Sequence, residues 1–229
     1  MISLIKISLA LCLILIGGRY PENVDLKSHG QRPYIIAAPM AFVVFFIGVC
    51  AGGMLDPSWN IMKHNLSDLG TGYRTLAAGL VFDYCCCMAG ALLAVFGFGK
   101  CLFEKEINKL AGLFFMIGGA FLALVGIANA EYLSLHNITA GMFAIFMATA
   151  IILTTVIDIK QGNKYVLVAS ILILIFLVVQ WPLVKGGLSE CMAIGSATVW
   201  FFVQLYKYWK NGSLAHVVPQ AASAADGAI

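Results

Sequence analysis

The chain has 229 residues, of which 61% are hydrophobic and 11% are charged, and its formal net charge is +3. Soluble domains carry about 25% charged residues, so this composition excludes a globular protein with an ordinary water-facing surface. The small positive charge, without any interleaving of basic and aromatic side chains, gives no indication of nucleic-acid binding.

The first apolar stretch covers residues 2–18, with Lys6 near its start and two glycines at its end. This pattern is typical either of a cleaved secretory signal or of a short membrane span. The charge distribution favours a retained span, because cleavage would invert the bias of positive charge across the membrane. We therefore interpret residues 1–18 as an N-terminal hydrophobic segment.

Six longer apolar segments follow, and most are close to the 20 residues that a helix needs to cross about 30 Å of hydrocarbon. They cover residues 34–55, 76–99, 110–130, 137–157, 165–184 and 189–206. The sequence therefore predicts an all-α, polytopic transmembrane helix bundle with a six-helix core over residues 34–209. The N-terminal segment brings the expected total to seven helices. Residues 210–229 are rich in Ala, Ser and Gly, which predicts a disordered cytoplasmic tail.

Positive charge is unequally divided between the connections. One set of alternate connections, together with the stretch after the last segment, holds ten Lys and Arg, and the opposite set holds four. Because basic residues are enriched in cytoplasmic loops, the first set is assigned to the cytoplasm. We therefore expect a multi-pass membrane protein with a cytoplasmic C-terminus and with the loop of residues 56–75 outside.

Most of the other polar groups that could carry chemistry gather on this predicted outer side. No charged residue falls in the cytoplasmic half of any of the six core segments as bounded above. Ionisable groups at membrane depth are costly, which makes them candidates for function. We expect the outer groups to converge on one outward-facing polar cavity. The candidate binding residues are Asn65, Ser67, Asp68, Asp83, Glu131, His136 and Glu190.

Simpler roles are available for several of these residues. Ser67 and Asp68 are residue types that cap helix N-termini, and Glu190 suits the first turn of a helix, where the macrodipole favours an anion. Glu131 and Glu190 lie at segment ends, where they could only touch water among the lipid head groups. Asp83 is harder to explain in this way, because it lies about two helical turns, near 10 Å, inside its segment.

The run Ser67-Asp68-Leu69-Gly70 after the first core segment, with His136 at the start of the fourth and Glu190 opening the sixth, resembles a known family. It is the multi-pass membrane family catalogued as domain of unknown function 998, and the resemblance covers about residues 34–209. The family pattern has an Asn three residues before the Ser, where this chain has His64. The resemblance implies the six-helix fold and brings no reaction with it.

Three functions remain open at this stage. The first is binding of a lipid, a small amphiphile or an ion in the outward-facing cavity, with membrane lipids as partners. The second is a non-catalytic subunit of a larger membrane complex, with other membrane proteins as partners. The third is a membrane-embedded hydrolase or transferase that uses Ser67, Asp68, His136 and Glu190. The sequence specifies no cofactor, and it contains no metal motif such as H-E-x-x-H and no C-x-x-C pair.

Overall fold

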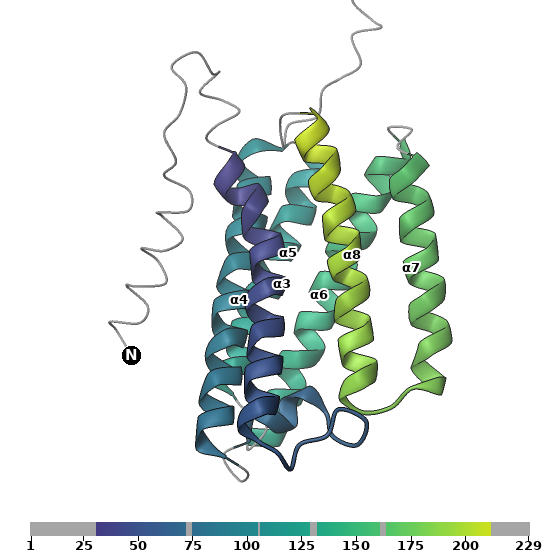
Figure 1. Cartoon of the computed structure of the whole chain (residues 1–229). Helices are drawn as coiled ribbons and strands as arrows, with labels where there is room; N and C mark the ends of the chain where they lie inside the picture. The colour runs from purple at the N-terminus through teal and green to yellow at the C-terminus, as the bar shows by residue number, and fades with distance from the viewer. Residues whose placement is uncertain (1–30, 72–74, 105, 129–131, 161–163, 212–229) are drawn as a thin grey trace, which may run out of the picture.

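A computed structural model describes residues 31–71, 75–104, 106–128, 132–160 and 164–211. Within these ranges the chain is helical and contains no strand, and its helices stand side by side in one bundle (Figure 1). Each of the six predicted core segments coincides with one α-helix. The helices are α3 (Arg32–Leu55), the short 3-10 helix η1 (Leu66–Gly70), α4 (Leu76–Phe103), α5 (Glu106–Ile127), α6 (Leu133–Lys160), α7 (Lys164–Leu183) and α8 (Gly187–Asn211).

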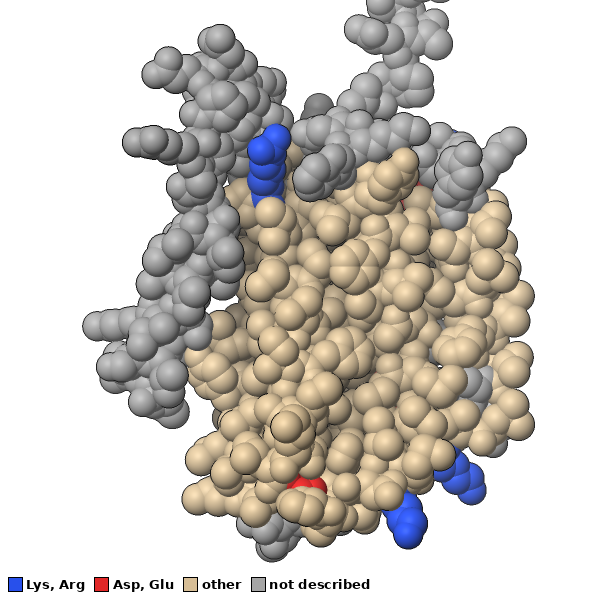
Figure 2. Space-filling model, in the orientation of Figure 1, with Lys and Arg blue, Asp and Glu red and all other residues tan. Residues whose placement is uncertain are grey.

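Five of the described helices are long and apolar enough to cross a membrane, namely α3, α4, α5, α6 and α8. α7 is a further apolar helix of 20 residues. The described side chains on the flank in Figure 2 are almost all uncharged, and the charged ones appear at its two ends. The protein is therefore an integral membrane protein. The expected total of seven helices is not confirmed, because residues 1–18 lie outside the described residues.

The helices alternate in direction, which gives the bundle two distinct ends. The loop between α3 and α4, which contains η1, lies at the bottom of Figure 1 together with the start of α8. We call this the η1 end. Lys100 lies near the end of α4 at the opposite end, where α8 finishes, and we call this the Lys100 end.

Glycines let α4 and α5 approach each other closely. A Cβ built on Gly90 would lie 2.5 Å from the Gly119 carbonyl oxygen, and one on Gly97 would lie 2.6 Å from that of Gly112. The glycines recur every seven residues on both helices, so they face the same seam. Because lipid tails are as apolar as the helices, such close packing is what holds membrane helices together.

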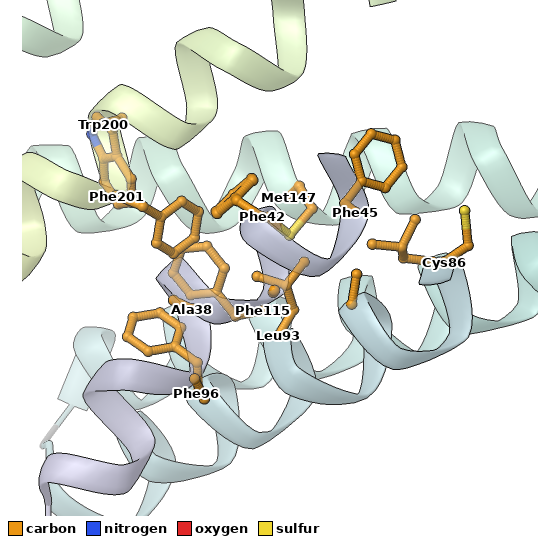
Figure 3. Close-up of a cluster of buried hydrophobic side chains, with 14 of the residues drawn as sticks. Ala38, Phe42, Phe45, Cys86, Leu93, Phe96, Phe115, Met147, Trp200 and Phe201 are labelled. Carbon is orange, nitrogen blue, oxygen red and sulfur yellow. The ribbon is translucent and has the colours of Figure 1, made fainter. Parts of the chain in front are cut away.

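Aromatic side chains fill the middle of the bundle (Figure 3). Phe201 of α8 packs against Phe42 of α3 and Phe115 of α5, with ring centroids 5.0 and 5.4 Å apart. Trp200 meets Phe201 edge to face, and its indole N–H donates a hydrogen bond to Ser170 of α7. α8 is thus fixed to the centre of the bundle, and α7 is joined to it by a polar contact.

Candidate functional site

η1 is stabilised by hydrogen bonds from polar residues within it and at its two ends. The Asp68 carboxylate accepts a hydrogen bond from the backbone N–H of Asn65, with 2.9 Å between Oδ2 and N. Thr71, just after η1, donates its hydroxyl hydrogen to the Asp68 carbonyl at 2.7 Å. Short polar side chains at this spacing reach the unpaired backbone donors of a first turn. Asp68 therefore takes part in capping η1, but from the third position, and the N-cap residue is Asn65 and neither Ser67 nor Asp68.

The loop before η1 is joined to the start of α8 through the main chain. The Gly187 N–H donates to the His64 carbonyl at 2.6 Å, and the Leu188 N–H donates to the Ile61 carbonyl at 2.9 Å. Gly186 has a φ of +68°, in the left-handed region that glycine adopts without strain. This turn brings α8 onto a loop that is far away in the sequence.

Glu190, in the first turn of α8, reaches from that helix to η1. Its Oε2 accepts a hydrogen bond from the Leu66 backbone N–H at 2.8 Å, and its side chain is half-buried. Its carboxylate also interacts electrostatically with Asp68 and His136. Glu190 of α8 is therefore bonded to η1, and the charges of Asp68 and His136 act on its carboxylate.

His136, near the start of α6, contributes a buried imidazole, with 7% of the residue exposed. Its Nδ1 lies 3.0 Å from the Ala128 carbonyl oxygen. Because a carbonyl oxygen can only accept, Nδ1 must carry the hydrogen of this bond. The other ring nitrogen, Nε2, then has its lone pair available whenever the imidazole is neutral.

Asp83 of α4 lies directly against η1. A Cβ added to Gly70 would come within 2.5 Å of the Asp83 Oδ1, so the absence of a side chain on Gly70 makes room for this carboxylate. Asp83 is half-buried. Asp83 is thus the third of the predicted acids with described coordinates to lie at the η1 end.

The remaining predicted residues contribute less to this arrangement. Asn65 is exposed, and its carbonyl accepts a hydrogen bond from the Trp59 indole at 3.0 Å. Ser67 is half-buried, and Glu131 lies outside the described residues. Among the residues that the structure describes, no three His, Cys, Asp or Glu side chains form a group that could hold a metal ion.

A second polar cluster, which sequence reasoning missed, lies buried at the Lys100 end. The Lys100 Nζ is 2.6 Å from Glu104 Oε1, and these two side chains are 1% and 0% exposed. Lys100 also donates to the Tyr208 hydroxyl of α8 at 3.0 Å. One turn earlier on α8, the Gln204 amide donates to Asp158 Oδ2 of α6 at 2.7 Å. These five residues, the Lys100 cluster, connect α4, α6 and α8.

The cytoplasmic halves of the segments bounded from the sequence hold no charge, but two of the helices extend beyond those bounds and the added turns are charged. α4 continues to Phe103 and α6 to Lys160, so Lys100 and Asp158 lie within helices and not in loops. The two expected segments ended directly before these charged residues, at positions 99 and 157. The helix continues past Lys100 because its ammonium group pairs with Glu104, four residues later on the same face. That spacing was the signal in the sequence that could have revealed the pair.

Two apolar grooves lie on the flanks of the bundle, and none of the predicted binding residues lines either of them. One groove, of about 440 Å³, lies between α3 and α8 and is lined by Val43, Phe46, Cys50, Thr198 and Phe202, among others. The other, of about 570 Å³, lies between α7 and α8. The polar cavity expected from the sequence thus remains a prediction, and the observed grooves are apolar.

Comparison with known proteins supports the fold. The model of a family described as "Protein of unknown function (DUF998)" matches residues 36–205, from the first turns of α3 to the last part of α8. No curated protein and no solved structure matches the chain. The resemblance expected from the sequence is confirmed, and the match covers about three quarters of the chain, including every predicted binding residue. This integral membrane protein therefore belongs to the DUF998 family.

Proposed function

We propose that the protein binds an amphiphile, a molecule with an apolar chain and a polar head, at the η1 end of the groove between α3 and α8. The chain of the amphiphile lies along the groove, and its head group reaches the cluster of Asp68, His136 and Glu190. The observation that carries the proposal is that Cys50, which lines the groove, interacts electrostatically with Cys191, the residue that follows Glu190 on α8.

The connection follows from the positions of these residues on the two helices. Cys50 lines the groove near the end of α3 and interacts electrostatically with Cys191 of α8, which is next to Glu190. Cys191 precedes Thr198, also in the groove, by seven residues, which is close to two helical turns and places both on one face of α8. The apolar groove therefore extends toward the polar cluster.

The chemical character of the two parts favours an amphiphile over a fully polar solute. The lining of the groove is almost entirely hydrocarbon and aromatic, and it faces the region that lipid tails occupy. A straight chain lying there keeps contact with both helices, while its head remains at the depth of the η1 end. Binding sites for small molecules commonly combine apolar walls with a few polar groups that fix orientation.

A pair of valine substitutions tests this proposal. Val43 lines the groove and is 46% exposed, whereas Val95 on α4 is 42% exposed and lies outside both grooves. The indole of Val43→Trp would fill the groove, and the indole of Val95→Trp would extend into lipid. We expect native mass spectrometry of protein released from lipid nanodiscs to show bound lipid in the parent and in Val95→Trp, and at least about tenfold less in Val43→Trp.

Equal lipid retention by the two valine variants would contradict the proposal, as would a parent protein that retains no lipid. The two other functions considered from the sequence, a subunit of a membrane complex and a hydrolase or transferase, remain predictions. The amphiphile is preferred because only this function uses the groove and the polar cluster together.

A further inference from the structure

We infer that the Lys100 cluster binds a water molecule inside the bundle, between Glu104 of α4 and Gln204 of α8. This site lies at the opposite end of the bundle from the proposed head-group site and does not depend on the proposed function. Each of the two side chains has one buried oxygen without a hydrogen-bond donor in the described part of the chain. A single water can donate to both oxygens.

Both side chains are satisfied at one end and unsatisfied at the other. Glu104 Oε1 accepts from the Lys100 ammonium at 2.6 Å and from the Tyr208 hydroxyl at 3.3 Å. The Gln204 amide nitrogen donates to Asp158 Oδ2 at 2.7 Å, which turns the amide oxygen away from that carboxylate. Glu104 Oε2 and Gln204 Oε1 are buried, and no described group donates to either. A buried acceptor without a donor is costly, so a donor that fits there stabilises the fold.

The two unsatisfied oxygens belong to side chains that meet around Tyr208. The Tyr208 hydroxyl is bonded to Glu104. Gln204 precedes Tyr208 by four residues on α8, and residues four apart are neighbours on one face of a helix. The Glu104 side chain is 0% exposed and Gln204 is 1% exposed. Both acceptors therefore lie in one solvent-excluded region between α4 and α8.

The charges and atom types of this region favour water over other small ligands. Both unsatisfied atoms are acceptors, so an anion, which also accepts, gains no hydrogen bond from them. The Lys100 ammonium is 2.6 Å from the other oxygen of the same carboxylate, and its charge disfavours a second cation beside it. Water is neutral and has two hydrogens to donate. Buried waters in proteins commonly bind polar groups that have no other partner.

A water at this position links two pairs of side chains into one network. It donates to Glu104 of the ion pair and to Gln204 of the pair that Gln204 forms with Asp158. Hydrogen bonds then run without interruption from α4 through α8 to α6. Because linked hydrogen bonds in a low-dielectric interior polarise one another, the water strengthens the attachment of these three helices.

Radiolytic labelling of the full chain in lipid nanodiscs tests the inference. X-ray irradiation converts ordered water into hydroxyl radicals, which oxidise the side chains beside it even where these are buried. Tyr208 is 3% exposed and Trp200, two turns earlier on the same face of α8, is 1% exposed. The Trp200 indole is bonded to Ser170 and provides the internal reference. We expect Tyr208 to be oxidised several-fold faster than Trp200, as read residue by residue by tandem mass spectrometry.

Two substitutions show whether the labelling depends on the proposed site. Gln204→Met removes one of the two acceptors and nearly keeps the size of the side chain, so oxidation of Tyr208 should fall several-fold. Thr154→Val is the matched control, because Thr154 is buried on α6 and its hydroxyl donates to the Ala150 carbonyl of its own helix. It should leave oxidation of Tyr208 as in the parent. Unchanged oxidation of Tyr208 in folded Gln204→Met would overturn the assignment.

A density map of the parent chain decides the question without any variant. At a resolution that shows ordered water, we expect a separate peak within hydrogen-bond distance of both Glu104 Oε2 and Gln204 Oε1. A protein donor bonded to either oxygen, or a map without such a peak, would contradict the inference. Equal oxidation of Tyr208 and Trp200 in the parent chain would do the same.

Discussion

The two ends of the bundle differ in how their buried and half-buried polar side chains are hydrogen-bonded. At the η1 end, polar side chains come from a loop and from helix ends, and several of them bind backbone N–H groups there. At the Lys100 end, polar side chains lie within or directly after helices and bind one another across the bundle. One end therefore holds its carboxylates on backbone donors, while the other pairs its charged groups with other side chains.

This difference has energetic consequences. A carboxylate bound to backbone N–H groups near the membrane surface can exchange partners with water or a ligand at modest cost. A buried ion pair can do so only by exposing an uncompensated charge to a low-dielectric interior. We therefore expect substitutions at the Lys100 end to change the stability of the bundle and substitutions at the η1 end to change binding.

The largest effect is expected from breaking the buried ion pair. Lys100→Met removes the ammonium group and leaves the Glu104 carboxylate fully buried without its charged partner. The expected loss of stability is about 3–5 kcal/mol. Thermal unfolding in detergent micelles, followed by circular dichroism, measures it.

The double variant Lys100→Met with Glu104→Leu serves as the control, because replacing both partners of a buried pair by apolar groups is often close to neutral. It should recover most of the stability that Lys100→Met loses. If Lys100→Met alone melts at the parent temperature, the two ends do not differ in the way described here.

A pair of glycine substitutions compares the two ends through smaller losses of stability. A methyl group at Gly112 would lie 2.7 Å from the Lys100 Cβ and 2.8 Å from the Gly97 carbonyl oxygen, within the fixed seam of α4 and α5. A methyl group at Gly70 would mainly meet the end of the Asp83 side chain, which can rotate away. We expect Gly112→Ala to cost about 1–3 kcal/mol and Gly70→Ala to cost less.

Gly195→Ala is the matched control for these two changes. Its methyl group would have no neighbour within 4 Å, so the higher helix propensity of alanine should leave stability equal or slightly higher. Equal melting temperatures for Gly112→Ala and Gly195→Ala would contradict the close packing of α4 against α5. A lower melting temperature for Gly70→Ala than for Gly112→Ala would reverse the comparison of the two ends.

The sequence predicted the η1 end better than the Lys100 end for a physical reason. A cap acts over about three residues, so the residue types of Ser67 and Asp68 indicated a capped helix in this loop before any tertiary structure is known, although the N-cap itself is Asn65. The contact between Glu190 and η1 could be expected only in general terms, because the predicted topology places both on the same side of the membrane. Its specific partner, the Leu66 N–H, depends on how the loop packs on α8, which no local pattern in the sequence encodes.

Charge at the Lys100 end was misjudged because hydropathy treats every lysine as a signal to end a membrane segment. Lys100 remains in α4 because Glu104 and Tyr208 satisfy its ammonium group, and Tyr208 lies 108 residues away in the sequence. The glycine seam was readable in principle, since Gly112, Gly119 and Gly126 recur every seven residues. That period indicates a face of close approach, but it does not identify the partner helix.

The smallest effect on stability is expected from single cysteine substitutions at the two ends of the bundle. Labelling these cysteines tests whether the two ends lie on opposite sides of the membrane. Lys63 precedes η1 and Lys109 lies in the first turn of α5, and both are exposed. Single cysteines at these positions should leave the melting temperature unchanged, because surface substitutions of this kind change stability little. With a membrane-impermeant maleimide on intact cells, and with the parent chain as the background, we expect Lys63→Cys to be labelled and Lys109→Cys to be labelled only after permeabilisation. The reverse pattern would place the η1 end in the cytoplasm, where the proposed amphiphile would have to come from the inner leaflet; labelling of both from outside would contradict a membrane-spanning bundle.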